Sequence, residues 1–173
     1  MGSLFLTTGD TSFLSSTIID GDSTDCTIAI YGNIDSTCRI TGFTIQNGIG
    51  CVYGQGAGIY VESASPRLDN LIIKNNISGT NGGGICLNGN SNSLIDKVLI
   101  KNNSADVGGG LYSFNSNPVI TNSIIQNNHA NNGAGVFLEL SSPNFENASI
   151  TDNNAISSGG GIYCGCLLYT SDA

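Results

Sequence analysis

Two aspartates, Asp69 and Asp96, are the residues of this chain best placed for carboxylate chemistry. Each directly follows an aliphatic residue in one of two similar segments, and Lys97 lies beside the second. Paired carboxylates supply the acid and base of glycoside hydrolysis, and a carboxylate with a neighbouring base suits a lyase. The matching positions further along hold Thr121 and Glu146, which makes this the best carboxylate column of the repeats. Because the column lies beside inward aliphatic residues, we interpret the pair as solvated outward positions and predict no catalytic residue here.

The densest acidic group is Asp20, Asp22 and Asp25, and oxygen ligands of this kind suit Ca²⁺. The spacing of an EF-hand loop is absent, however, and an Asp-Gly dipeptide is a common turn. The single histidine, His129, follows an Asn-Asn pair and has no nearby Ser or Cys partner in the sequence. We predict no metal site and no cofactor.

The six cysteines include no CxxC pair with metal-ligand spacing. Several of them read as small buried hydrophobic residues, since free cysteine is among the most buried residue types. The best candidates for a disulfide are Cys26 and Cys38. The pattern leaves the redox compartment open.

Composition excludes several classes of protein. The chain has 173 residues, 24 Gly, 22 Asn and a net charge of −8, and its five basic residues are scattered along the sequence. Gly and Asn form helices poorly and turns well. Without a basic stripe we expect no nucleic-acid partner, and no apolar run reaches the roughly 18 residues of a membrane span. Low charge with abundant Asn, Ser, Thr and Gly favours an extracellular or cell-surface protein.

The elements that would position any site follow from an internal repeat. A Gly-x-Gly-aliphatic mark recurs at intervals of 26, 26, 25 and 26 residues, in segments 56–59, 82–85, 108–111, 133–136 and 159–162. An Ile-x-Asn-Asn mark runs in phase with it at 73–76, 100–103 and 125–128, with Asp152 replacing the first Asn at 150–153. Constant spacing of two marks is the signature of a solenoid.

Each copy holds three short strands. After the glycines, aliphatic and outward residues alternate as in a strand with one buried face. Small polar residues or proline break this strand, and two further short strands follow before the Asn-Asn turn. Each strand is too short to fold alone, so equivalent strands of successive coils must pair in parallel, about 4.8 Å apart. This predicts an all-β parallel β-helix of about 26 residues per coil, in which the Asn columns 75/102/127/152 and 76/103/128/153 form internal ladders. The leucine-rich-repeat pattern is absent, and an antiparallel sandwich would not require a constant period.

The marks resemble the GGAI and FxxN motifs of polymorphic outer-membrane-protein repeats, with Ile replacing Phe. The segment 40–48, preceded by 17–21, is similar to the opening coils of many bacterial right-handed β-helix proteins of pectin-lyase-like fold. This resemblance covers about residues 15–165 and implies a right-handed, single-stranded β-helix of five to six coils. It specifies activity poorly, because the same helix carries lyases, hydrolases, adhesins and passive stalks.

One outward position offers a binding surface. Between the inward aliphatics the residues of successive coils are mostly aromatic, and Phe114 flanks them two positions further on. Such a strip suits the apolar faces of sugar rings. The candidate ligand-binding residues are Tyr60, Tyr112, Phe114, Phe137 and Tyr163.

Residues 1–165 therefore read as a β-helix fragment that is uncapped at both ends and prone to end-to-end self-association. Residues 166–173 break the repeat and resemble the translation of a sequencing adaptor, so we interpret them as a non-native tail. The leading functional hypothesis is a secreted or cell-surface module, an adhesin-like or stalk scaffold that binds glycans or proteins. The alternative is a fragment of a polysaccharide lyase or glycoside hydrolase whose active site lies outside this segment.

Overall fold

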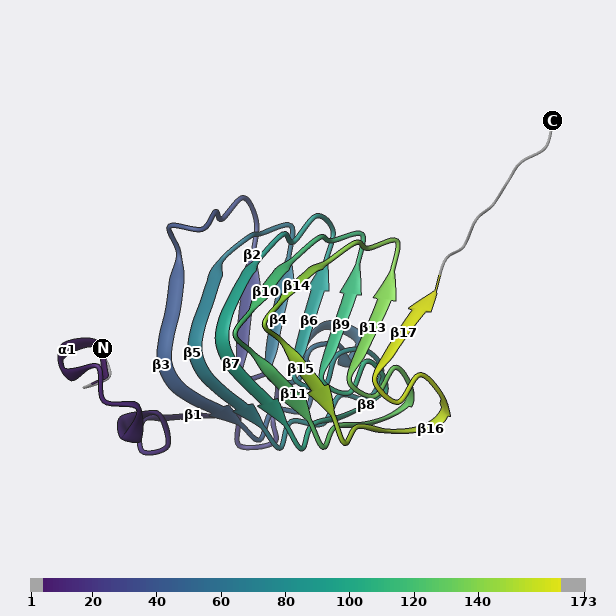
Figure 1. Cartoon of the computed structure of the whole chain (residues 1–173), viewed down its shortest axis with the longest axis horizontal. Coiled ribbons are helices and arrows are strands. Elements are labelled where there is room, and N and C mark those ends of the chain that lie inside the picture. The colour runs from purple at the N-terminus through teal and green to yellow at the C-terminus, as the bar shows by residue number, and fades with distance from the viewer. Residues whose placement is uncertain (1–4, 166–173) are drawn as a thin grey trace.

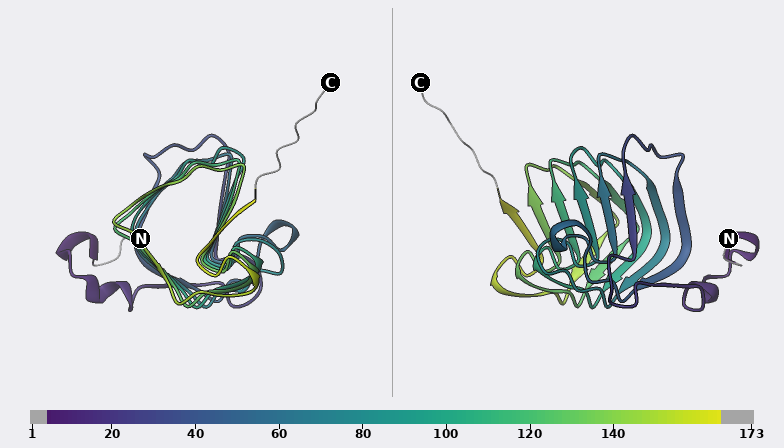
Figure 2. Two further views of the ribbon diagram at one scale, coloured as in Figure 1. Left: turned by 45° about the vertical axis from the view of Figure 1, so that its right-hand side comes forward. Right: turned by 180° about the vertical axis from the view of Figure 1, so that it is seen from behind.

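The computed structural model describes residues 5–165, except for the side chain of Val52, and its strands stack as successive coils of one solenoid (Figure 1). Seen nearly along the stacking axis, the coils project onto almost the same outline (Figure 2). All strand pairs are parallel, and each joins neighbouring coils. The predicted parallel β-helix with three strands per coil is confirmed. The tail assigned to residues 166–173 lies outside the described residues.

Sheet A forms one wall of the solenoid. Its strands are β1 (Ile18–Asp20), β3 (Arg39–Gln46), β5 (Arg67–Lys74), β7 (Leu94–Lys101), β10 (Val119–Thr121), β11 (Ile124–Gln126), β14 (Asn144–Glu146) and β15 (Ser149–Thr151). The second and third strands predicted for each coil are joined in β3, β5 and β7. They meet at a residue of positive φ, such as Asn70 or Lys97, which bends the strand without ending it.

Sheet B forms the opposite wall and begins directly after each glycine mark. Its strands are β2 (Ile28–Tyr31), β4 (Ile59–Glu62), β6 (Ile85–Asn88), β9 (Leu111–Phe114), β13 (Val136–Glu139) and β17 (Ile162–Gly165). Equivalent residues lie in register from coil to coil, as with Glu62, Asn88 and Phe114. A side chain on this sheet therefore has the corresponding side chains of the adjacent coils as its neighbours.

A short third sheet follows the Asn-Asn turn, where the sequence suggests only a turn. Sheet C contains β8 (Ser104–Val107), β12 (His129–Asn132) and β16 (Asn154–Ser158). Its residues are mostly polar, so apolar alternation does not reveal the strands. Ala105 and Ala130 are nevertheless buried, and backbone hydrogen bonds join the coils regardless of side-chain type. We call the residues between each Asn-Asn turn and the following sheet B strand the return segment.

The core consists of aliphatic columns inside the coils, as predicted. Equivalent residues one coil apart are almost completely buried in the columns Ile59/Ile85/Leu111/Val136, Leu68/Ile95/Ile120 and Ile73/Ile100/Ile125. A coil alone contributes only a few of these side chains. Most of the burial therefore takes place between neighbouring coils.

An asparagine ladder runs beside this core. The side chains of Asn76, Asn103 and Asn128 are at most 1% exposed. Each donates from Nδ2 to Oδ1 of the next coil's Asn, with Asn153 ending the series, over 2.9, 3.1 and 2.9 Å. This predicted ladder is confirmed. The preceding column is exposed instead and supplies left-handed backbone, with φ between 54° and 56° at residues 75, 102, 127 and 152.

Helical structure among the described residues is short. The α-helix α1 (Phe5–Thr8) and the 3-10 turn η1 (Thr11–Leu14) lie beside the first coil next to β3 (Figure 1). The Thr44 hydroxyl donates to the carbonyl of Leu14 over 2.6 Å. A third turn, η2 (Val52–Gly54), lies in the loop between β3 and β4. None of the helices within residues 5–165 is long and apolar enough to cross a membrane.

Candidate functional site

The predicted aromatic column lies on the outer face of sheet B, but part of it is covered. Tyr60 is 3% exposed and Tyr112 is 6% exposed, with the fully buried Cys86 between them. Phe114, Phe137 and Tyr163 are half-buried. Phe137 stacks between Tyr112 and Tyr163, with ring centroids 5.6 and 4.8 Å apart. The prediction of an exposed aromatic strip is therefore wrong for Tyr60 and Tyr112.

The glycine mark itself explains this burial. Gly108 has φ +69°, a conformation that favours glycine, and a Cβ there would lie 2.9 Å from Cβ of Tyr112. The chain thus turns back over the outer face of the strand that it is about to enter. Val107 in the return segment packs on the buried cluster of Tyr60, Cys86 and Tyr112. The column is a second small core between sheet B and the return segments.

Next to this second core lies an open groove of about 370 Å³, which we call the sheet B groove. Its lining residues are Gln55, Glu62, Asn81, Asn88, Gly89, Tyr112, Phe114 and Glu139. The last residues of β4, β6, β9 and β13 form its floor as an in-register row of Glu62, Asn88, Phe114 and Glu139. At about 4.8 Å per coil, the row spans roughly 14 Å along the stacking axis.

Hydrogen bonds fix the polar groups of the groove. The Tyr112 hydroxyl donates to Oε2 of Glu139 over 2.7 Å. Nδ2 of Asn88 donates to Oε1 of Gln55 over 2.9 Å and to the Tyr60 hydroxyl over 3.2 Å. Burial, with a smaller contribution from the charge of Glu62, raises the pKa of Tyr60 to about 12. Burial and the bond to Glu139 likewise raise the pKa of Tyr112. Both phenols therefore stay protonated at neutral pH, and Tyr112 acts as a donor to Glu139.

Sequence reasoning identified only part of this groove. Tyr112 and Phe114 are predicted ligand-binding residues that line it, and Glu62, Asn88 and Glu139 are outward residues that flank the aromatic column. Gln55 and Asn81 come from return segments. Each directly precedes a glycine mark, but neither belongs to an apolar alternation, so the sequence carries no signal that places them opposite the row.

The carboxylates Asp69 and Asp96 lie elsewhere, on sheet A, in different surroundings. Asp69 is fully buried and accepts two hydrogen bonds from Arg39, each 2.6 Å long. Arg67 donates to Asp69 over 3.0 Å and lies 3.9 Å from Asp96. Asp96 itself accepts from the Thr121 hydroxyl over 2.8 Å. The solvated outward position predicted for Asp69 is wrong, because two guanidinium groups cover it.

Because of Asp69, we expect the stability of the fold to depend on pH in the acidic range. Burial alone would raise the pKa of this carboxyl, but hydrogen bonds from Arg39, Thr41 and Asn70 outweigh it and lower the pKa to about 2 from the ordinary 3.8. A depressed folded-state pKa stabilises the fold above the unfolded value, and this contribution is lost as pH falls through 2. Urea unfolding should show a falling midpoint between about pH 4 and pH 2.

Replacing the residue separates this cause from general acid denaturation. Asp69→Asn should cost about 2 kcal/mol at pH 7, the range for hydrogen bonds to charged groups, and should weaken the acid dependence. Asp22→Asn removes an exposed carboxylate and should change neither the free energy of unfolding at pH 7 nor its acid dependence. An unaltered acid dependence in Asp69→Asn would contradict the assignment.

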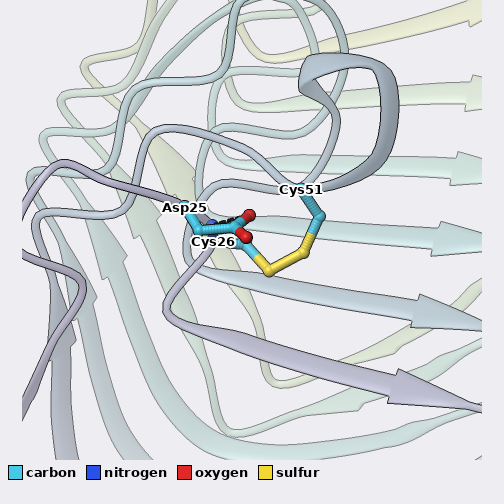
Figure 3. Close-up of side chains that lie close together, drawn as sticks. All are labelled: Asp25, Cys26 and Cys51. Atoms are coloured by element: carbon cyan, nitrogen blue, oxygen red, sulfur yellow. Dashed lines mark hydrogen bonds between the residues drawn. A yellow bond between two sulfur atoms is a disulfide. The ribbon is translucent and has the colours of Figure 1, made fainter.

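The acidic group at the first turn takes part in hydrogen bonds within the chain. Asp20 accepts hydrogen bonds from Gln46 and Asn47, each 2.8 Å long, and so organises the turn. Within residues 5–165 one group of potential metal ligands lies close together, namely Asp25, Cys26 and Cys51 (Figure 3). Cys26 and Cys51 form a disulfide. The thiolate is the form of cysteine that binds metals, so this group offers a cation little beyond one carboxylate.

The disulfide also corrects a prediction. Cys38, the expected partner of Cys26, is free and half-buried. Cys26 and Cys51 are 25 residues apart and their Cα atoms are 4.7 Å apart, because one coil of chain returns to the same side of the solenoid. A separation of 12 residues leads to a different side of the same coil.

Comparison with known proteins supports the architecture. The family described as the right handed beta helix region matches residues 3–173. The chain belongs to this right-handed β-helix family. Searches of curated proteins and of solved structures each gave no match. The family fixes the handedness of the coils, and it is compatible with a cell-surface module or one related to an enzyme. The finer likeness to polymorphic outer-membrane-protein repeats stays a prediction.

Proposed function

We propose that this right-handed β-helix is a secreted or cell-surface scaffold that binds glycans through the sheet B groove. The observation that carries the proposal is the composition of the groove floor. A half-buried ring, Phe114, lies in register between the amide of Asn88 and the carboxylate of Glu139. Rings contact the apolar faces of sugars, while amides and carboxylates bond their hydroxyls.

Two other features support the proposal of a secreted or cell-surface scaffold that binds glycans. The strands that carry the row are fixed on both sides by neighbouring coils, so the side chains are pre-organised and lose little freedom on binding. The Cys26–Cys51 disulfide agrees with an oxidising, extracytoplasmic compartment. A stalk or adhesin-like role accords with an elongated solenoid that presents such a surface along its length.

Glycan-array binding tests the proposal, with the array repeated for two variants. Phe114→Ala should lower binding of the strongest glycan about tenfold, since stacking on an aromatic side chain contributes roughly 1 kcal/mol or more. Tyr53→Ala is the control, because Tyr53 is 88% exposed near the groove without lining it. Unchanged binding in Phe114→Ala, or equal loss in both variants, would contradict the assignment. Capture of proteins but of no glycan would favour a protein partner instead.

A further inference from the structure

The basic residues of this protein gather on one of its two walls. All five basic residues of the chain lie in β3, β5 and β7 of sheet A, although they are scattered in the sequence. The lining of the sheet B groove contains Glu62 and Glu139 and no basic residue. The two carboxylates therefore give the groove a negative electrostatic potential, which no basic residue of the lining offsets.

Among the residues that the structure describes, the two groove carboxylates form no ion pair. Within residues 5–165 the ion pairs join Arg39 and Arg67 to Asp69 and Asp96, and none involves Glu62 or Glu139. Glu139 is held by the neutral Tyr112 hydroxyl, which orients the carboxylate without neutralising it. Both charges are thus available to a ligand.

We propose that the sheet B groove selects glycans that carry free amino groups, that is, polymers of the glucosamine type. This inference rests on the proposed glycan-binding function. An ammonium group on the sugar would pair with Glu62 or Glu139, and one sugar ring would lie on Phe114. The hydroxyls of the sugar would bond to the amide side chains of the groove, Asn88 among them. The row spans roughly 14 Å, so the ligand is an oligosaccharide that reaches both carboxylates.

Other charged ligands fit this arrangement less well. Uronic-acid chains carry carboxylates that Glu62 and Glu139 would repel. A calcium ion needs several oxygen ligands at 2.3–2.6 Å, and among the described residues no group of three potential metal ligands includes either glutamate. An amino sugar combines the positive charge, the hydroxyls and the apolar ring face that the lining calls for.

Calorimetric titration of the whole chain tests the inference with three probes: the glucosamine tetramer, its N-acetylated form and an uncharged glucose tetramer. At mildly acidic pH the glucosamine tetramer should bind at least about fivefold more tightly than the other two, the scale of an exposed ion pair. Glu62→Gln and Glu139→Gln should each reduce that preference, and the double variant should abolish it. Added salt should reduce it as well.

Asp152→Asn is the matched control. It removes the same charge outside the groove, and asparagine occupies the equivalent position in the other coils at Asn75, Asn102 and Asn127. This variant should keep the preference. Circular dichroism would confirm that each variant is folded.

The outcomes separate the two proposals. Equal binding of all three tetramers, or a preference that survives in the double glutamine variant, would overturn the amino-sugar inference and leave glycan binding standing. Equal loss in Asp152→Asn would also overturn it, since attraction would then follow net charge alone. Binding of none of the tetramers, with no glycan bound on the array, would overturn both.

Discussion

Replacing Gly110 by alanine is expected to destabilise the β-helix by at least about 3 kcal/mol, the upper range for overpacking a core. A Cβ at this position would lie 2.5 Å from the carbonyl oxygen of Gly135 in the next coil and 2.8 Å from Cγ2 of Ile125. The first neighbour is backbone, so it can move only if the two coils separate. The urea midpoint, followed by far-UV circular dichroism, measures the loss.

Gly79→Ala provides the control for that experiment. Gly79 also lies between an Asn-Asn turn and a sheet B strand, but it has no atom within 4 Å of an added Cβ and no positive φ. We expect Gly79→Ala to change the free energy of unfolding by less than about 1 kcal/mol, with a correspondingly small shift of the urea midpoint. Equal effects of the two substitutions would show that the glycine mark does not act through close approach of the coils.

The second large effect is expected at the centre of the asparagine ladder. Oδ1 of Asn103 accepts from the backbone and side chain of Asn76, and its Nδ2 donates to Asn128 and to the carbonyl of Ile73. Asn103→Ala leaves these buried groups without partners, at about 1–3 kcal/mol for each unsatisfied group. We expect a loss of about 3 kcal/mol or more in urea unfolding.

The adjacent residue supplies the comparison. Asn102 is exposed and has φ 55°, a conformation that glycine adopts readily. Asn102→Gly should therefore cost less than about 1 kcal/mol. If the two variants unfolded at the same urea concentration, the ladder would contribute little to stability, and the hydrogen bonds that hold the coils together would have to be those of the backbone.

The interior of the solenoid was predictable because its signals are local and repeat. Ile59, Ile85 and Leu111 follow the same glycine mark at the same interval, so alternation alone places them inside. The ladder of Asn76 and Asn103 follows from the same reasoning, because in-register stacking brings equal residues together.

The features that the sequence did not reveal depend on the return segments, which form sheet C and cover part of the outer face of sheet B. Sheet C has no apolar alternation, so residues such as His129 and Asn131 give no strand signal. The burial of Tyr60 and Tyr112 requires knowing that the chain folds back before it enters sheet B. By contrast, the Cys26–Cys51 separation of 25 residues, close to one repeat, was a usable signal.

The floor of the sheet B groove draws one residue from each coil: Glu62, Asn88, Phe114 and Glu139. The row holds three residue types that differ in charge, size and polarity, while the inward residues on the same strands stay almost wholly aliphatic. Substitution at the row thus leaves the interior unchanged. Duplication or loss of one repeat would lengthen or shorten the floor by a single residue without altering the fold. Point mutation and unequal recombination can therefore change the binding specificity of such a protein by one residue per repeat.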